Sequence, residues 1–151
     1  MPQSLAQIYV HLVYSTKDRY PWLQSKQLQA DVHAYLSATL NNMDCPCLKA
    51  GGVADHVHLL CRLSRTITVA NLVRDIKKAS SSMLSDRGGN LRGFHWQNGY
   101  GAFSISPSHV PALTKYIEDQ EEHHRRESFQ DEFRRLLRKY GIEFDERYVW
   151  D

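Results

Sequence analysis

The chain has 151 residues, 42% of them hydrophobic and 24% charged, a composition typical of one compact globular domain and not of a disordered chain. Its formal net charge of +2 neither requires nor excludes a nucleic-acid partner. The sequence contains neither an apolar stretch long enough to span a bilayer nor a signal-peptide pattern, so we expect a cytoplasmic protein without a membrane partner.

The first half of the chain alternates between strand and helix patterns. Residues 7–15 are rich in β-branched and aromatic side chains and predict a strand. Apolar residues then recur at helical spacing over residues 24–40. Residues 47–53 and 56–63 predict an antiparallel pair of strands, in which Gly51 and Gly52 indicate a bulge or a close backbone approach.

The second half continues with three helices and one strand. A helix is predicted over residues 68–84, and residues 96–105 predict an aromatic strand interrupted by glycines. Pro111 suits the first turn of the next helix. Residues 129–140 predict a last helix, which Gly141 ends.

The first six elements follow the order strand, helix, strand, strand, helix, strand. This is the split β-α-β-β-α-β order of ferredoxin-like α+β domains, in which helices cover one face of an antiparallel sheet. We therefore expect a single domain over residues 1–151, with the C-terminal helices free to cover the other face. Such a fold hosts many activities, so the function must be inferred from a site.

Two histidines lie in the apolar segment 55–60, Asp-His-Val-His-Leu-Leu. Side chains alternate along a strand, so His56 and His58 are expected on one face. Two imidazoles on one face can supply part of the ligand set of a divalent metal. The alternative is a pair of polar surface histidines, and a third ligand elsewhere would decide between the two.

Gln120 is a candidate for the third ligand, and Tyr116 lies four residues before it in the sequence. Side chains four positions apart lie on the same face of a helix, so the phenol and the amide are expected to project together. A metal held by His56, His58 and the Gln120 carbonyl oxygen would place a nucleophile beside a Lewis acid, which is the chemistry needed to join a tyrosine to a DNA phosphate. Tyr116 alone could equally be a core residue.

Two further groups of polar residues lie on the predicted helices. His123 and His124 could attract metal, but adjacent helix positions diverge, so we do not include them in the site. Basic residues and serines of the helix 68–84 are expected to be exposed together and to bind DNA phosphates. The candidates are Arg74, Lys77, Lys78 and Ser81, in a helix whose polar face also carries Ser80 and Ser82. A merely solvated helix face is the alternative.

In combination these motifs resemble the single-tyrosine HUH transposases of the insertion sequence 200/605 type. The resemblance covers nearly the whole chain and is carried by Ser15-Thr16-Lys17, Asp55-His56-Val57-His58-Leu59-Leu60, Ile76-Lys77-Lys78-Ala79-Ser80-Ser81, Phe94-His95-Trp96-Gln97-Asn98-Gly99-Tyr100 and Tyr116-Ile117-Glu118-Asp119-Gln120. Residues 144–150 lie beyond the matching motifs.

The resemblance implies a metal-dependent DNA strand transferase. Its metal, Mg²⁺ or Mn²⁺, would be bound by His56, His58 and Gln120, and Tyr116 would form a 5′-phosphotyrosine bond with single-stranded DNA. It also implies recognition of hairpin ends and a homodimer in which the tyrosine helix can complete the partner's site.

Two other classes of protein share parts of this pattern. One is a domesticated or inactive relative that only binds DNA hairpins, and the other is a structural metal-binding domain. The complete set of His56, His58, Tyr116 and Gln120 argues against both. Replication initiators are similar in having the paired histidines. Their helix motif, however, is usually a tyrosine followed by a lysine, and residues 116–120 do not match that motif.

Overall fold

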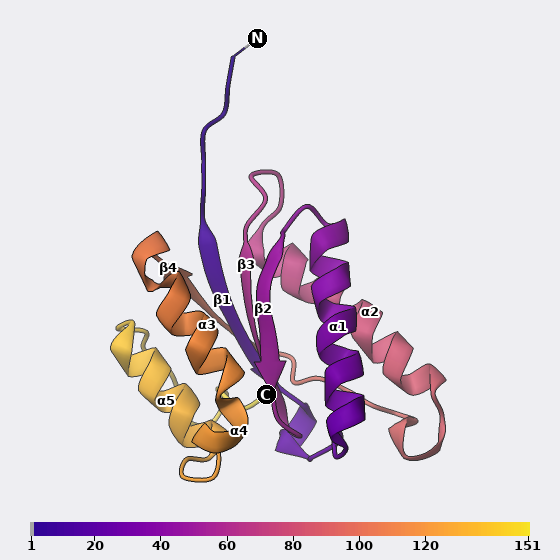
Figure 1. Ribbon diagram of the computed structural model, residues 1–151. Coiled ribbons are helices and arrows are strands. Elements are labelled where there is room, and N and C mark those ends of the chain that lie inside the picture. Colours follow the sequence, from indigo (N-terminus) through magenta and orange to yellow (C-terminus); the bar gives the residue numbers. More distant parts are fainter. Residues whose placement is uncertain (1) are drawn as a thin grey trace.

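The computed structural model describes residues 2–151 as a four-stranded antiparallel sheet with helices on both faces (Figure 1). The strand order is β2-β3-β1-β4, the arrangement expected of a ferredoxin-like domain. The elements are β1 (Tyr9–Ser15), α1 (Lys26–Asn42), β2 (Cys47–Gly52), β3 (His56–Arg62), α2 (Val69–Asp86), β4 (Gly101–Ile105), α3 (Val110–Glu118), α4 (Gln120–His123) and α5 (Phe129–Lys139), with three short 3-10 turns at Lys17–Arg19, Gly89–Leu91 and Pro107–His109.

Helices α1 and α2 cover one face of the sheet and form the larger hydrophobic core (Figure 1). Side chains of β1 and β3 that point to this face, including Leu12 and Leu59, are fully buried against them. Each helix begins at a residue that satisfies a free backbone N–H, because Ser25 accepts from Leu28 N at 3.0 Å and Thr68 accepts from Asn71 N at 3.1 Å.

The C-terminal helices cover the opposite face, where Val13 and Phe103 pack against apolar residues of α5. Helix α3 lies directly on β2. A Cβ atom at Gly51 would be only 2.7 Å from the carbonyl oxygen of Ile117, so the predicted close backbone approach is confirmed. The irregular pairing in β2 lies between Cys47 and Lys49 and not at the glycines.

The fourth strand is shorter than the sequence predicts. It begins at Gly101, whereas Trp96 forms only an isolated bridge with Thr16. The intervening residues leave the ladder because Gln97 is bonded to Ser15 through both its backbone N–H and its side-chain oxygen, at 2.9 and 2.8 Å. The other predicted elements agree with the structure to within about two residues at each end.

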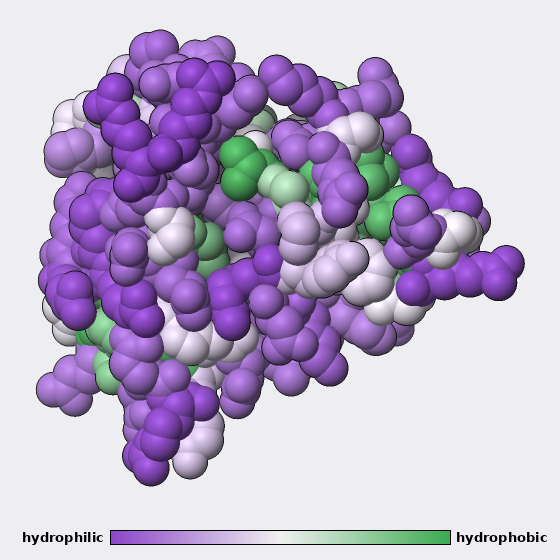
Figure 2. Space-filling model, turned by 90° about the horizontal axis from the view of Figure 1, so that it is seen from below, coloured by the Kyte–Doolittle hydropathy of each residue, from purple (hydrophilic) through white to green (hydrophobic). Residues whose placement is uncertain are grey.

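Hydrophilic residues dominate the face seen from below, with apolar residues in a few small patches (Figure 2). None of the described helices is both long enough and apolar enough to cross a membrane.

Ser80 is not on an exposed polar face of α2, as the sequence suggested, but is fully buried. Its hydroxyl donates to the Ile76 carbonyl at 2.7 Å and accepts from the indole N–H of Trp96 at 2.9 Å. This contact holds the segment before β4 against α2.

We expect Ser80→Ala to lower the free energy of unfolding by about 1–3 kcal/mol, because the buried indole N–H loses its acceptor. The exposed Ser82 on the same helix is a matched control, and Ser82→Ala should stay within about 0.5 kcal/mol of the parent. Urea unfolding measures both variants. Equal stability of the two would show that the Trp96 contact contributes nothing.

Candidate active site

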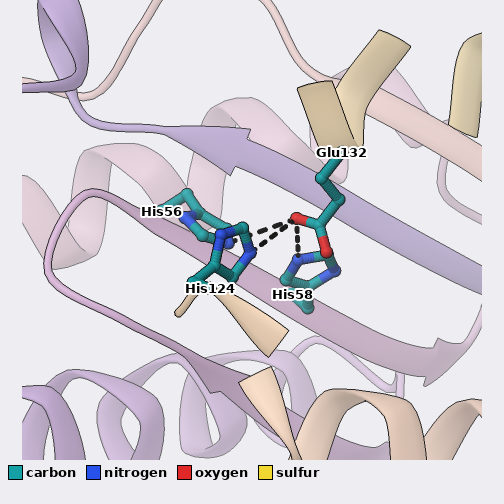
Figure 3. Close-up of side chains that lie close together, drawn as sticks. All are labelled: His56, His58, His124 and Glu132. Carbon is teal, nitrogen blue, oxygen red and sulfur yellow. Dashed lines mark hydrogen bonds and ion pairs between the residues drawn. The ribbon is translucent and has the colours of Figure 1, made fainter. Parts of the chain in front are cut away.

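His56 and His58 lie on β3 with both side chains pointing to the face that α3, α4 and α5 cover (Figure 3). Both are fully buried, so they are not surface histidines. Their positions follow from the two-residue period of the strand, since Val57 between them belongs to the core on the other face.

Tyr116 and Gln120 converge on the same place from the C-terminal helices. Helix α3 ends at Glu118 and α4 begins at Gln120, yet both side chains turn toward the histidines. The Gln120 Oε1 atom lies 3.0 Å from His56 Nε2, and the ring centroids of Tyr116 and His58 are 5.8 Å apart. The structure therefore brings together the four residues that the sequence selected, while their roles stay predictions.

A carboxylate that the sequence analysis did not select lies between these residues. Glu132 on α5 is fully buried, with Oε1 at 2.9 Å from His58 Nε2, 3.1 Å from His124 Nε2 and 3.4 Å from His56 Nε2 (Figure 3). Its other oxygen accepts from Gln120 Nε2 at 3.1 Å. The Tyr116 hydroxyl also donates to Glu132. We call this group of six residues the Glu132 cluster: His56, His58, Tyr116, Gln120, His124 and Glu132.

The sequence did contain a signal for Glu132. It shares one face of α5 with Phe129, Phe133 and Leu136, where every neighbour is apolar and buried. A lone acid within such a stripe must be paired when the helix packs, because an unpaired buried charge is costly.

His124, which the sequence analysis did not include in the site, lies in the Glu132 cluster. His123 and His124 do diverge, as adjacent helix positions must, but only one of them needs to face the cluster. His124 does so, and its other ring nitrogen lies 2.7 Å from the Glu127 carbonyl oxygen. His123 is partly exposed and lies at the edge of the cluster, with Nε2 at 3.3 Å from the Tyr116 hydroxyl and 3.5 Å from Glu132 Oε2.

The buried charges shift the pKa values of the two histidines in opposite directions. Burial lowers the pKa of His58 to about 4, against the attraction of Glu132. Burial also opposes protonation of His56, but hydrogen bonds to Asp55 and Glu132 outweigh it and raise the pKa to about 9. Burial favours a neutral Glu132 as well, yet the surrounding imidazoles hold its pKa far below the ordinary value.

Tyr116 is a weak acid in this environment. Burial raises its pKa above the ordinary value of 10, and the negative charge of Glu132 raises it further. Arg135 acts in the opposite direction, since its Nη2 atom donates to the Tyr116 hydroxyl at 2.8 Å. Arg135 is also paired with Glu127 at 3.1 Å.

The donor set fits a divalent metal ion. Nitrogen atoms of three imidazoles and a carboxylate oxygen lie within 4.8 Å of one another, in residues His56, His58, His124 and Glu132. Imidazole and carboxylate ligands together suit ions such as Mn²⁺. The Nδ1 atom of His58 lies 2.8 Å from Nε2 of the buried His11, a contact that can fix the ring orientation of a ligand.

The predicted DNA-binding residues of α2 are not all exposed. Arg74 and Lys78 are exposed and Ser81 is partly buried. Lys77 is partly buried because its ammonium group donates to the carbonyl oxygens of residues 97, 98 and 99, at 2.8, 3.2 and 2.6 Å. The expectation that Arg74, Lys77 and Lys78 are exposed together is therefore wrong for Lys77, whose contacts a helical period cannot reveal.

Comparisons with known proteins find a matching family and similar folds. The family model described as "Transposase IS200 like" matches residues 4–120. A protein of Deinococcus radiodurans R1 described as a transposase candidate is 19% identical, with a TM-score of 0.62, over 80% of this chain and 95% of that one. A REP-associated tyrosine transposase bound to a REP hairpin is 14% identical, with a TM-score of 0.60, over 82% of this chain and 73% of that one. No curated protein matches the chain significantly.

We expect Asp55→Asn to move the pKa of His56 from about 9 toward its ordinary 6.5, because it removes an anion 2.7 Å from Nδ1. A raised pKa means that protonated His56 stabilises the fold fully below pH 6.5 and that this contribution disappears as the pH rises through about 9. Long-range ¹H–¹⁵N NMR of the metal-free protein measures the titration. An unchanged pKa in Asp55→Asn would assign the shift to another group.

Proposed function

The chain belongs to the IS200-like transposase family, and we propose that it cuts and rejoins single-stranded DNA through a covalent bond between Tyr116 and a 5′ phosphate. The observation that carries this proposal is the placement of the Tyr116 hydroxyl on Glu132, beside His56 and His58. A nucleophile next to a cluster of metal-ligating groups is what phosphodiester transfer requires.

The transfer exchanges one ester bond for another. The Tyr116 oxygen attacks the phosphorus, the bond from phosphorus to the 3′ oxygen breaks, and the 3′ oxygen leaves as a hydroxyl after gaining a proton. Glu132 accepts the hydrogen of the Tyr116 hydroxyl and is placed to pass that proton on to the leaving 3′ oxygen, so the carboxylate ends the step ionised, as it began. Rejoining is the reverse, with a 3′ hydroxyl attacking the phosphotyrosine.

The metal proposed is Mg²⁺ or Mn²⁺, held by His56, His58 and Gln120, with His124 and Glu132 as the further donors that the fold brings to the same point. When bound, such a cation supplies positive charge that polarises a phosphate oxygen and offsets the Glu132 charge that holds the pKa of Tyr116 high. Metal binding must also release the proton of His56, which makes the affinity depend on pH.

Arg135 provides the remaining positive charge. Its guanidinium donates to the Tyr116 oxygen, so it favours the phenolate and can contact the phosphate that this oxygen attacks. The same Nη2 atom and the Nε atom of Arg135 also donate to the Glu127 carboxylate, at 3.1 and 3.2 Å, which fixes the position of the guanidinium.

We propose single-stranded DNA with hairpins as the substrate, because one structural neighbour is a tyrosine transposase bound to a REP hairpin. The described chain places Tyr116 against its own His58. A homodimer that exchanges the tyrosine helix is therefore proposed as an assembly and is not required to build the cluster. A relative that binds hairpins without cutting them is the alternative, and it differs in forming no covalent product.

Tyr116→Phe should abolish the covalent DNA adduct, because it removes only the attacking oxygen. Tyr20→Phe, at a tyrosine that is 56% exposed, is the matched control and should form the adduct as the parent does. Single-stranded DNA from the flanks of the gene is incubated with Mn²⁺, and denaturing electrophoresis detects the product. An adduct that persists in Tyr116→Phe would transfer the role to another residue.

Arg74→Ala with Lys78→Ala should weaken single-strand binding and make the slope of log affinity against log salt shallower by roughly 1.4, at about 0.7 per lost phosphate contact. The exposed pair Arg62, the last residue of β3, and Arg65, in the loop before α2, provides a control with the same loss of charge. Fluorescence anisotropy at several salt concentrations measures both double variants. Equal slopes for the two would show that α2 does not contact the DNA.

A further inference from the structure

A pocket of about 570 Å³ lies beside Tyr116, between α3, α5 and the end of β4. This volume is within the range of ligand pockets, about 300–1,000 Å³. Of the residues that line this pocket, only Tyr116 and Arg135 have a role in the proposed DNA transfer. The residues that define it are His11, Leu113, Tyr116, Arg135, Lys139 and Tyr140.

The walls of the pocket suit a flat apolar ring. Leu113 of α3 and Leu136 of α5 supply aliphatic sides, and Tyr140 supplies an aromatic one. The Tyr140 ring is fixed by stacking on Phe103, with centroids 4.7 Å apart and an interplanar angle of 28°. A preformed aromatic surface stacks any nucleic-acid base, because every base presents a π face.

The rim of the pocket suits phosphate. Arg135 and Lys139 are exposed and lie four positions apart on α5, so they project from one face of the helix. None of the described residues that line the pocket carries a carboxylate, although Glu127 is paired with Arg135 and Glu132 accepts from Tyr116 just outside the lining, so Lys139 is the rim cation that a phosphate meets without a carboxylate partner among the described ion pairs. Because Arg135 Nη2 lies 2.8 Å from the Tyr116 oxygen, a phosphate bound at this rim lies beside the nucleophile.

The floor of the pocket connects it to the Glu132 cluster. His11 lines the pocket and lies 2.8 Å from His58 Nδ1 through its own Nε2. The pocket and the metal-ligating nitrogens are thus separated by one imidazole, with Tyr116 at the side of both.

From this arrangement we propose that the pocket holds the base of the nucleotide next to the scissile phosphate, with Arg135 and Lys139 binding its phosphates. The proposal rests on the proposed function, to which it adds a subsite. The DNA strand bends at this nucleotide, because its base leaves the base stack and enters the pocket while its phosphate stays at Tyr116. An unstacked base beside the nucleophile also fixes which phosphate is attacked.

The test is a titration of the protein with thymidine 3′,5′-bisphosphate, followed by calorimetry. Ala112→Trp fills the pocket from an exposed position on α3, and Lys139→Ala removes a cation of the rim. We expect the affinity to fall about tenfold in each variant, through lost stacking or a lost phosphate contact. Arg138→Ala, at an exposed neighbour that does not line the pocket, is the matched control and should keep the affinity of the parent.

Mn²⁺ binding is measured on the same variants and should be unchanged, which shows that the Glu132 cluster stays intact. If both pocket variants keep the affinity of Arg138→Ala, or if the bisphosphate does not bind, the subsite is wrong even when the parent forms a DNA adduct. If the bisphosphate binds as expected but no adduct forms with any DNA, the subsite holds and the proposed transfer fails.

Discussion

The site depends on one buried negative charge. Removing a carboxylate such as Glu132 from water costs several kcal/mol, about as much as the fold can lose, unless partners surround it. Here β3 supplies His56 and His58, α4 supplies Gln120, the turn after α4 supplies His124, and α3 supplies the Tyr116 hydroxyl. The carboxylate therefore ties the C-terminal helices to the sheet and determines where the tyrosine lies.

The same charge determines the acidity of its neighbours. Together with Asp55 it raises the pKa of His56, and together with burial it raises that of Tyr116, so the cluster holds one proton on a proposed metal ligand and another on the proposed nucleophile. Positive charge placed among these residues favours the loss of both protons. This coupling gives a physical reason why metal binding and nucleophile activation would occur together at one site.

Local periodicity was sufficient to select four residues that the structure brings together, His56, His58, Tyr116 and Gln120. A strand repeats every two residues, which places His56 and His58 on one face. The four-residue spacing of a helix selected Tyr116 and Gln120, which both reach the cluster although the helix is interrupted at Asp119 between them. The order of the elements likewise predicted the sheet, because a β-α-β-β-α-β chain has few compact arrangements.

The remaining residues could not be predicted from periodicity because their positions depend on contacts between distant segments. Glu132 meets His58 across 74 positions of the chain, and no local pattern encodes that pairing. The helical period predicts that Lys77 is exposed. In the structure, the loop before β4 folds over Lys77, and its carbonyl oxygens accept hydrogen bonds from the ammonium group. Residues 96–100 have the composition of a strand but are held out of the ladder by Gln97.

The most direct measurement is a crystal structure of the protein grown with Mn²⁺, with anomalous diffraction recorded at the manganese edge. We expect one anomalous peak at about 2 Å from both His56 Nε2 and His58 Nε2, with the Glu132 carboxylate displaced from its direct hydrogen bonds to these nitrogens. The absence of a peak there, with Glu132 still bonded directly to the histidines, would contradict a metal-dependent site.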